Sequence, residues 1–359
     1  MYITFSGDVD QFALYRRLPL KAVSRAWGYF NGLRLPVWLR TPAFSLYIWL
    51  FDCQLHEAAV TDLTSYKNLS EFFRRQLRAG VRPVDHSHVL TSPADGRVLY
   101  NGKVINGALE QVKGVTYSLK GFLGPFQGLL GPCSNKLCQT TPYANISYLD
   151  LTLNPNNDLH HGCICNTSTF DRAMEEDDDL IGRLLVHPEN MLHYCIIYLA
   201  PGDYHRFHSP ADWTVMARRH FPGELFSVKP GVARWLQGLF NYNERAVYTG
   251  KWRHGFFSMT AVGATNVGSI NVYFDEELVT NTGESHDPGF YTDKYFCPKN
   301  GRGKGIRIKQ GQAFGDFNLG STIVLLFEAP EDFEFKSPPG SKILVGKPLG
   351  HYSRKSILN

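Results

Sequence analysis

The chain has 359 residues, of which 43% are apolar and 19% are charged, and its formal net charge is +4. This composition supports a sizeable core and excludes a wholly disordered chain, while the length suggests about two domains. Residues 1–51 carry six basic side chains against two acidic ones, so the rest of the chain is electrically balanced. A nucleic-acid-binding chain is usually basic over a broad surface, whereas a single basic end indicates a local anionic partner and no nucleic acid.

The N-terminal stretch 11–51 contains no acidic residue, and its basic side chains alternate with large apolar ones. Pro19, Pro36 and Pro42 are expected to divide it into short amphipathic helices. Basic residues together with tryptophan and phenylalanine are typical of helices on an anionic membrane surface. The alternative is a helical cap that packs on the core, and both can hold. The longest early apolar run, 43–51, is far shorter than the roughly twenty residues of a spanning helix, so we expect association without crossing.

The next segment, NLSEFFRRQLRAG, predicts a further helix. Ser70 can act as its N-cap, the helix would run from Glu71 to about Arg78, and Gly80 can end it.

From residue 82 onward the pattern changes to short apolar runs bounded by Gly, Pro, Asn or Asp, which predict strands. We therefore expect an α+β fold with an N-terminal, membrane-associating helical region over 1–80 and a β-rich catalytic domain over 81–359. The expected strands are GRVLYNGKVI, LHYCIIYLAP, GFFSMTAVGA, GSINVYF and STIVLLFEA.

Residues 125–185 differ in composition and are rich in Gly, Pro, Asn, Cys and His. We interpret most of this segment as a variable surface insertion that is partly disordered. Within it, HHGCIC at 160–165 offers metal-ligating side chains, but their spacing fits no standard site. The chain has seven cysteines and no C-x-x-C pair, so we predict neither a disulfide framework nor a bound metal.

Two short stretches in the β-rich region carry residues suited to chemistry. In SPADGRV, Asp95 lies between Ala94 and Gly96, which by itself is typical of a turn. In APGDYHRFHSP, Asp203, His205 and His208 follow an apolar strand directly. Two histidines at this spacing can be ligands, catalysts or surface residues, and the stretch alone does not separate these alternatives.

A third stretch, FNLGSTIVLLFEAP, places a Gly320–Ser321 pair at the start of a buried strand. Together with Asp95 and His208, Ser321 could form a hydrolase triad, although no G-x-S-x-G elbow is present. Alternatively, the serine oxygen could attack the preceding carbonyl, convert the peptide into an ester and leave a pyruvoyl group after elimination. Glycine favours this second use because it has no Cβ to obstruct the attack. A pyruvoyl ketone can serve as an electron sink, as pyridoxal phosphate does in other enzymes.

These motifs occur together and in order, and on them the chain resembles the phosphatidylserine decarboxylase family, in particular its mitochondrial type in animals. LGST at Leu319–Thr322 is similar to the family's self-cleavage motif, and SPADG and LAPGDYHRFHSP are similar to its two other signatures. The resemblance covers about residue 12 to the end, apart from the insertion. Further similar segments are EQVKGVTYSL, FPGELFSVKPG, NER and VGATNVGSI.

The resemblance implies a role for each candidate residue. Ser321 would cleave its own peptide bond and become the pyruvoyl group, with His208 as the activating base and Asp95 orienting His208. His205 would handle the proton at the substrate carbon during decarboxylation, and Asp203 would support the histidine loop.

The resemblance also implies how the chain would be processed. Cleavage at Gly320–Ser321, supported by the flanking Leu319 and Thr322, would yield a β chain of residues 1–320 and an α chain of residues 321–359. The two chains would stay together because the first strand of the α chain belongs to the core.

The implied reaction is decarboxylation of phosphatidylserine to phosphatidylethanolamine and CO2. The pyruvoyl group would form a Schiff base with the substrate amine, so no metal and no added cofactor would be needed. The implied partners are phosphatidylserine, an anionic membrane surface and a second copy in a homodimer. The implied location is the mitochondrial inner membrane, facing the intermembrane space, although no targeting peptide or spanning helix is recognisable before Phe12.

Three alternatives stay open at this point. A serine hydrolase using Asp95, His208 and Ser321 would keep its chain intact. A pyruvoyl decarboxylase for a soluble amino acid would cleave itself but would not need the N-terminal amphipathic stretch. A lipid-binding protein without catalysis would be uncleaved and release no CO2.

Overall fold

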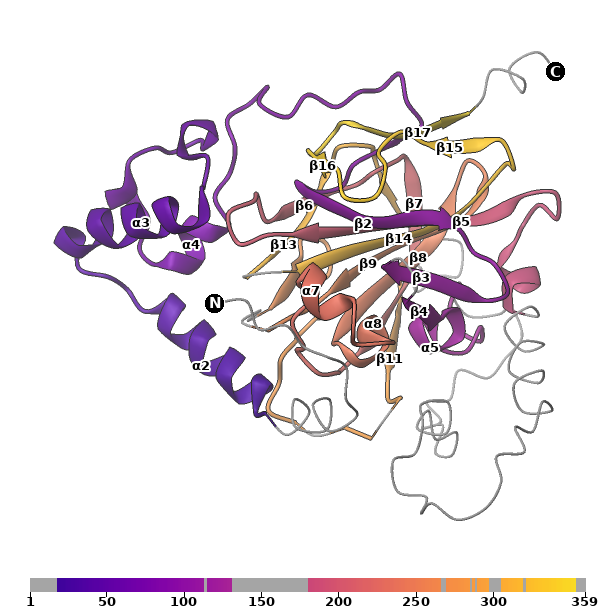
Figure 1. The fold of residues 1–359 in the computed structure, drawn as a ribbon, viewed down its shortest axis with the longest axis horizontal. Coiled ribbons are helices and arrows are strands. Elements are labelled where there is room, and N and C mark those ends of the chain that lie inside the picture. Colours follow the sequence, from indigo (N-terminus) through magenta and orange to yellow (C-terminus); the bar gives the residue numbers. More distant parts are fainter. Residues whose placement is uncertain are drawn as a thin grey trace.

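The structure is a computed structural model in which a large antiparallel sheet and smaller sheets form the body, with a group of helices at one side (Figure 1). Helices dominate the first part of the chain and strands dominate the rest, which confirms the predicted α+β class. Nothing in the structure tests the predicted division at residue 80. The described residues are 18–112, 115–130, 180–265, 269–284, 286–287, 289–296, 305–318 and 321–352.

The N-terminal helices are α2 (Leu20–Gly32) and α3 (Val37–Phe51). Proline precedes each one, but Pro42 lies inside α3 and does not end it as predicted. Pro42 falls in the second turn, where the only bond it removes is the one to the carbonyl four residues earlier. The other described helices are η1 (Leu55–Glu57), η2 (Leu63–Ser65), α4 (Leu69–Phe73), α5 (Leu119–Leu123), α7 (Pro230–Ala233) and α8 (Leu239–Tyr242).

The helix predicted to reach residue 78 is shorter, and its cap differs. Helix α4 ends at Phe73, and its N-cap is Asn68, whose Oδ1 accepts a hydrogen bond from Glu71 N at 2.8 Å. Ser70 lies inside the helix with its hydroxyl buried and unpartnered among the described residues. Both residues can cap a helix, and the placement of the first turn against α2 decides between them.

Nine strands form the main sheet, in the order β11-β7-β8-β9-β14-β5-β2-β16, with β12 also paired to β7. All of its pairings are antiparallel, and all five segments predicted as strands are strands. The strands are β1 (Leu90–Thr91), β2 (Gly96–Lys103), β3 (Ala108–Val112), β4 (Val115–Ser118), β5 (Met191–Leu199), β6 (Arg206–His208), β7 (Trp213–Phe221), β8 (Arg245–Trp252), β9 (Gly255–Val262), β10 (Ile270–Val272), β11 (Thr292–Tyr295), β12 (Ile306–Ile308), β13 (Ala313–Phe317), β14 (Ser321–Ala329), β15 (Phe333–Phe335), β16 (Lys342–Ile343) and β17 (Pro348–Tyr352).

Strand β14 runs through the middle of this sheet, between β5 and β9, and every one of its nine residues is buried. Ile323, Leu325 and Phe327 face one hydrophobic core, and Val324 and Leu326 face the other. A strand covered on both faces needs apolar side chains at successive positions, which explains the unbroken apolar run in the sequence.

Glu328 fixes the far end of β14. Its fully buried carboxylate accepts hydrogen bonds from the backbone N–H groups of Val186, His187 and Phe256 and from Asn190 Nδ2, at 2.8–2.9 Å. Four donors satisfy a charge that would otherwise be costly to bury. Strand β14 is therefore tied to two other parts of the chain by polar contacts as well as by the sheet.

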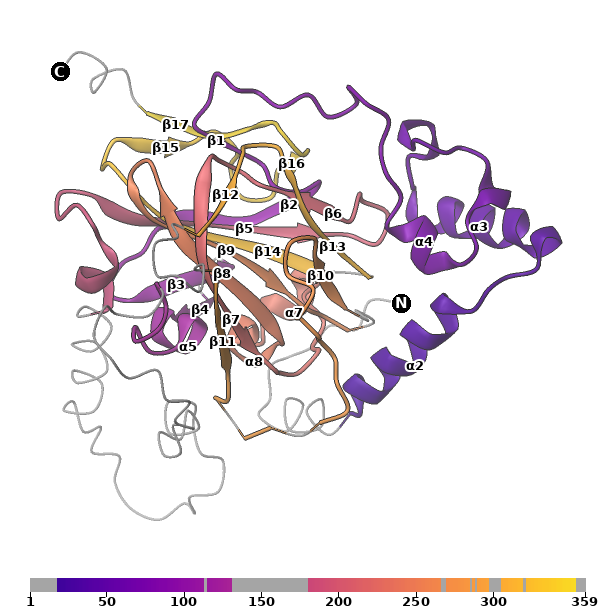
Figure 2. The same cartoon turned by 180° about the vertical axis from the view of Figure 1, so that it is seen from behind.

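The helices dock on residues 200–205, the loop that follows β5 and that we call the histidine loop. Tyr47 Oη donates to Pro201 O at 2.9 Å, and Arg206 Nε donates to Arg74 O at 2.8 Å. The approach is closest at Gly202, where a Cβ would lie 1.8 Å from Phe51 O. Figures 1 and 2 show the same arrangement from both sides, with α4 nearest the ends of β6 and β13 and α3 further out.

The outer surface of these helices is unusually apolar. Trp38 and Trp49 are 77% and 78% exposed. Helix α3 is apolar around most of its circumference, whereas α2 has separate polar and apolar faces. Within the described part of the chain, no helix combines the length and the apolar character that a membrane crossing requires. Other exposed apolar side chains here are Val23, Trp27, Tyr29, Phe30, Val37, Leu46 and Leu50.

Gly202→Ala is expected to loosen the docking of the helices on the histidine loop. The new methyl group would meet the backbone of Phe51, so either the loop or the end of α3 must move. We expect a loss of about 1–3 kcal/mol of stability, seen as a lower melting temperature in scanning fluorimetry. Gly231→Ala, where a Cβ meets nothing within 4 Å, is the control and should leave the melting temperature unchanged or raise it. Equal behaviour of the two variants would refute this account.

Candidate functional site

The two signatures around Asp95 and the histidines lie side by side. His208 N donates to Pro93 O at 2.7 Å, and Thr91 N donates to Pro210 O at 2.9 Å. The SPADG turn is thus hydrogen-bonded to the segment that carries both histidines.

The segment before Ser321 lies against the histidine loop. In the sheet, Ser321 is opposite Leu199, the last residue of β5, and Phe317 N donates to His205 O at 3.0 Å. Phe317 and Ser321 are therefore both anchored to the segment 199–205, at His205 and at Leu199. Leu319 and Gly320 lie outside the described residues, and so does the HHGCIC stretch.

Ser321 is completely buried at the start of β14. Its Oγ has no hydrogen-bond partner among the described residues, and the same is true of Thr322 Oγ1. Buried hydroxyl groups are nearly always paired because an unpaired one costs about 1–3 kcal/mol. Unpartnered buried hydroxyl groups also occur at Ser258 and Thr260 on β9, so what distinguishes Ser321 is its place at the start of β14, opposite the end of β5.

His208 is partly exposed, and each of its two ring nitrogens has a hydrogen-bond partner. Nδ1 lies 3.0 Å from Gly311 O, so it carries the proton and donates it, which leaves Nε2 as the acceptor. Tyr204 Oη lies 3.2 Å from Nε2 and is the matching donor. Burial lowers the pKa of His208, while Gly311 O and the charge of Asp95 oppose that shift. His208 is therefore a neutral base with its lone pair on a defined atom.

Asp95 is buried and is bound by Arg82 and not by His208. Arg82 Nη2 approaches Asp95 Oδ2 to 2.6 Å and also pairs with Glu57, and Val345 N donates to Asp95 Oδ1 at 2.8 Å. No hydrogen bond between Asp95 and His208 is found among the described residues. The link between them is the charge of Asp95, which raises the pKa of His208. Direct orientation of His208 by Asp95 remains a prediction.

His205 is fully buried against the ring of Phe73, with ring centroids 3.9 Å apart. Its Nδ1 donates to Asp203 O at 2.8 Å, and its Nε2 has no partner among the described residues. Burial lowers the pKa of His205 to about 3, so the ring is neutral at physiological pH. The free lone pair on Nε2 can take a proton from a bound ligand.

Asp203 closes the histidine loop on itself. Its Oδ2 accepts a hydrogen bond from Ala200 N at 2.7 Å, and burial raises the pKa of its carboxyl group. Asp203 supports the loop by the local turn geometry that aspartate favours.

Three residues near the site were not singled out from the sequence. Arg82 binds Asp95, and Tyr204 binds His208, as described above. Arg75 is 3% exposed, its Nη2 reaches Gly202 O at 3.4 Å, and its Nε and Nη1 are unpartnered among the described residues. Tyr204 lies between Asp203 and His205 in the sequence, and this position could have drawn attention to it. Arg75 gives no such signal, because FFRRQLR by itself indicates only an exposed basic helix.

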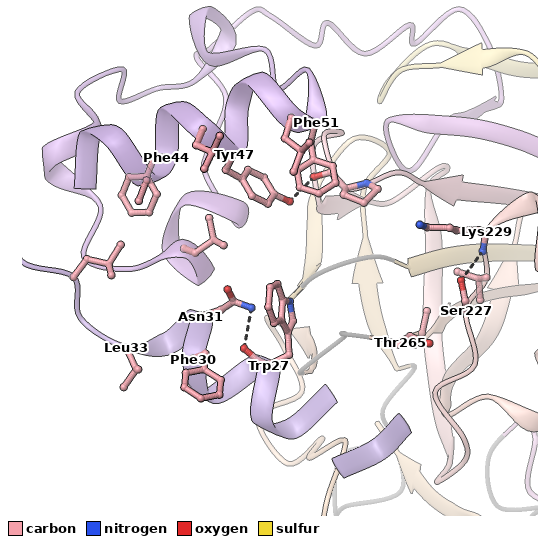
Figure 3. A pocket seen from close by; sticks show the side chains of 18 of the residues that line it. Trp27, Phe30, Asn31, Leu33, Phe44, Tyr47, Phe51, Ser227, Lys229 and Thr265 are labelled. Carbon is pink, nitrogen blue, oxygen red and sulfur yellow. Dashed lines mark hydrogen bonds between the residues drawn. The ribbon is translucent and has the colours of Figure 1, made fainter. Parts of the chain in front are cut away.

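A cavity of about 510 Å³ lies between the N-terminal helices and this end of the sheet (Figure 3). Trp27, Phe30 and Leu50 line it on the helix side, and Tyr198 and Pro201 line it on the side of the histidine loop. Its volume is that of a typical small-molecule site. The site thus has an apolar space at the end of the sheet where β5 ends and β14 begins.

Comparison with known proteins identifies the family of this site. Residues 69–351 match the family described as Phosphatidylserine decarboxylase, so the chain belongs to that family. A protein from Pongo abelii named "Phosphatidylserine decarboxylase proenzyme, mitochondrial" is 49% identical over 95% of this chain and 74% of its own length. A second relative is "Phosphatidylserine decarboxylase proenzyme 1, mitochondrial" from Schizosaccharomyces pombe, which is 42% identical over 95% of this chain and 82% of its own length. A protein of the same name from Arabidopsis thaliana is 36% identical over 94% of this chain and 73% of its own length.

Acid is expected to destabilise the fold through His205. The pKa is about 3 in the folded chain and about 6.5 when unfolded, so below pH 6.5 the unfolded chain takes up a proton that the folded chain does not. The stabilisation is complete above pH 6.5 and falls by up to about 1.4 kcal/mol per pH unit as the pH drops towards 3.

This dependence can be measured by urea unfolding between pH 7.5 and 5 in a Ser321→Ala background, which keeps one continuous chain. His205→Asn should reduce the pH slope by one proton, and His56→Asn, at an exposed position, is the matched control. An unchanged slope in His205→Asn would show that His205 is already protonated in the fold.

Proposed function

We propose that this protein converts phosphatidylserine to phosphatidylethanolamine and CO2, using a pyruvoyl group that it makes from Ser321 by self-cleavage. The observation that carries the proposal is the buried Ser321 Oγ, which has no partner among the described residues and lies at the start of the central strand, opposite the end of β5 from which the histidine loop leaves. Membership of the phosphatidylserine decarboxylase family supports the reaction, and the word "proenzyme" in the relatives' names supports processing.

Self-cleavage uses the chain's own atoms. Ser321 Oγ loses its proton, attacks the carbonyl carbon of Gly320 and displaces the amide nitrogen, so the peptide bond becomes an ester. Loss of the Cα proton then expels the Gly320 carboxylate and leaves a dehydroalanine. Water adds to the corresponding imine and ammonia leaves, which gives the N-terminal pyruvoyl group.

His208 is the base in these steps. Its Nδ1–H is committed to Gly311 O, so Nε2 is the only ring atom that can accept the serine proton. Tyr204 Oη occupies that lone pair in this structure and must yield to the serine, or relay its proton. The charge of Asp95, fixed by Arg82, favours the protonated imidazolium that results.

The residues at the start of β14 fit a pyruvoyl group. Ser321 Oγ and His205 Nε2 are both buried without partners among the described residues, so polar atoms are available for the group that would replace the serine. The pyruvoyl ketone supplies an electrophile for the substrate amine and a sink for the electrons that remain when CO2 leaves.

His205 moves the proton during turnover. Its Nε2 can relay the proton that the substrate amine releases as it reacts, and deliver it to the carbon that has lost CO2. With a pKa of about 3, the ring holds that proton only transiently and donates it readily. Asp203 O holds Nδ1–H throughout, so the proton always enters and leaves at the same nitrogen.

The two fragments are expected to stay together after cleavage. Strand β14 is paired along its length with β5 and β9, and Glu328 ties it to four donors from the larger fragment. Separation would expose a central strand and unpair a buried carboxylate, which costs far more than the cut bond contributes to folding.

The lipid is expected to reach the site from a membrane on which α2 and α3 lie. Their exposed tryptophans suit the interface, and the basic N-terminal end suits anionic lipid. The relatives' names support a mitochondrial location. Within the mitochondrion we propose the inner membrane, facing the intermembrane space, and a homodimer.

Ser321→Ala should abolish both processing and activity, because no hydroxyl group remains to attack the backbone. Intact mass spectrometry should show the wild type as fragments 1–320 and 321–359, the smaller blocked to Edman sequencing, and the variant as one chain. Release of CO2 from phosphatidylserine by Ser321→Ala would rule out the mechanism. A hydrolase using the same residues would keep the wild-type chain whole.

We expect His208 to be needed for self-cleavage and His205 to be needed for turnover. His208→Ala should remain one chain, because the base for the serine is missing. His205→Ala should be cleaved but turn over at least 100-fold more slowly, as expected for loss of a proton-transfer group. Gel electrophoresis and a CO2 assay measure the two steps, and an uncleaved His205→Ala chain would contradict this division.

A further inference from the structure

The cavity beside the site has two different walls. On the helix side its lining is apolar and includes Phe30, Leu46 and Leu50. On the side of the body it is lined by Ser227, Lys229 and Thr265. Figure 3 shows the side chain of Lys229 extending from the body towards the helices, with Trp27 and Phe51 across the space.

The cavity is continuous with the strand ends that flank Ser321. Tyr198, in its lining, is the sheet partner of Thr322, and Pro201 follows two residues after the sheet partner of Ser321. On the other flank, Val262 is also a partner of Thr322, and the lining residues Ala264 and Thr265 follow directly. A ligand in the cavity therefore reaches the residues on either side of the start of β14.

Lys229 is a cation without a partner. It is exposed, and no ion pair to it is found in the described part of the chain. The nearby carboxylate of Glu224 is bound instead by Lys21, at 3.4 Å. The backbone N–H of Lys229 donates to Ser227 Oγ at 3.4 Å, which fixes the point from which the lysine side chain extends. An unpaired ammonium group facing an apolar cavity fits a ligand with one anionic group and a hydrocarbon part.

We infer that Lys229 binds the phosphodiester of the phospholipid while its glycerol and acyl part lies against α2 and α3. This inference rests on the proposed function and names the residue that makes the site select a phospholipid over free serine. Lysine is well suited to phosphate as a compact charge.

The phosphodiester fits this position better than the serine carboxylate does. The carboxylate belongs at Ser321, because it is attached to the same carbon as the reacting amine, whereas the phosphodiester lies further along the headgroup, next to the glycerol. A cation held on the carboxylate would also stabilise the charge that must be lost, and would slow the reaction. The phosphodiester keeps its charge from substrate to product, so its contact with Lys229 is unchanged through turnover.

The test uses the processed enzyme with dihexanoyl-phosphatidylserine below its micelle concentration, so that no membrane is present. Lys229→Gln should raise KM about tenfold, the usual effect of losing one charge-assisted hydrogen bond, and Lys229→Glu should raise it further. The inhibition constant of dihexanoyl-phosphatidylethanolamine should rise by the same factor, because this product retains the phosphodiester and lacks the carboxylate. Lys251→Gln, exposed on β8, is the matched control and should change neither constant.

Each other outcome overturns the assignment. A raised KM with unchanged inhibition by the ethanolamine lipid would place Lys229 on the carboxylate. Unchanged constants together with weaker binding to vesicles of phosphatidylserine and phosphatidylcholine would place it on the membrane surface. Unchanged constants and unchanged vesicle binding would leave it without a ligand.

The same experiment separates this inference from the proposed function. Processing of the chain and CO2 release by the wild type test the function, and neither depends on the identity of residue 229. If the wild type is cleaved and active while Lys229→Gln behaves like Lys251→Gln, only the phosphodiester assignment fails.

Discussion

The burial of β14 between β5 and β9 is the constraint on which the rest of this structure depends. Antiparallel pairing on both sides fixes the position of Ser321 against the end of β5, and the β6–β13 pairing fixes the segment just before it against His205. A serine held this way can be presented repeatedly in one orientation to its own preceding carbonyl, which a serine on a mobile loop could not be. The same pairing would retain the strand after the proposed cleavage.

Desolvation sets the chemistry of the site. Burial lowers the pKa of both histidines, so each is a neutral base, and the carbonyls of Gly311 and Asp203 decide which nitrogen is free. These two contacts leave His208 Nε2 beside Tyr204 and His205 Nε2 without a partner among the described residues. One histidine is thus linked to a hydroxyl network, and the other is open to a ligand. This difference is the physical basis for giving them different steps.

The N-terminal helices join the candidate site to an exposed apolar surface. They contact the histidine loop through Tyr47 and Phe51, and they form the apolar wall of the cavity that ends at Lys229. Their outer surface carries exposed tryptophans, so one element can touch a membrane, a bound acyl chain and the catalytic loop. A lipid can then pass its headgroup to the sheet end while its hydrocarbon part remains in contact with apolar surface throughout, which avoids exposing it to water.

The sequence by itself determined the elements with strong local patterns: the apolar run of β14, the other strands bounded by turn residues, and the basic, aromatic N-terminus. It also singled out Ser321, His205 and His208, because their motifs are local. The tertiary structure alone decided that Arg82 binds Asp95, that Asn68 and not Ser70 caps α4, and that a cavity lies beside Lys229. The physical reason is the separation along the sequence of the residues that encode each feature. A strand or a motif is encoded by the spacing of neighbouring residues, whereas an ion pair or a cavity wall depends on segments brought together by pairing registers, and no local pattern records those registers.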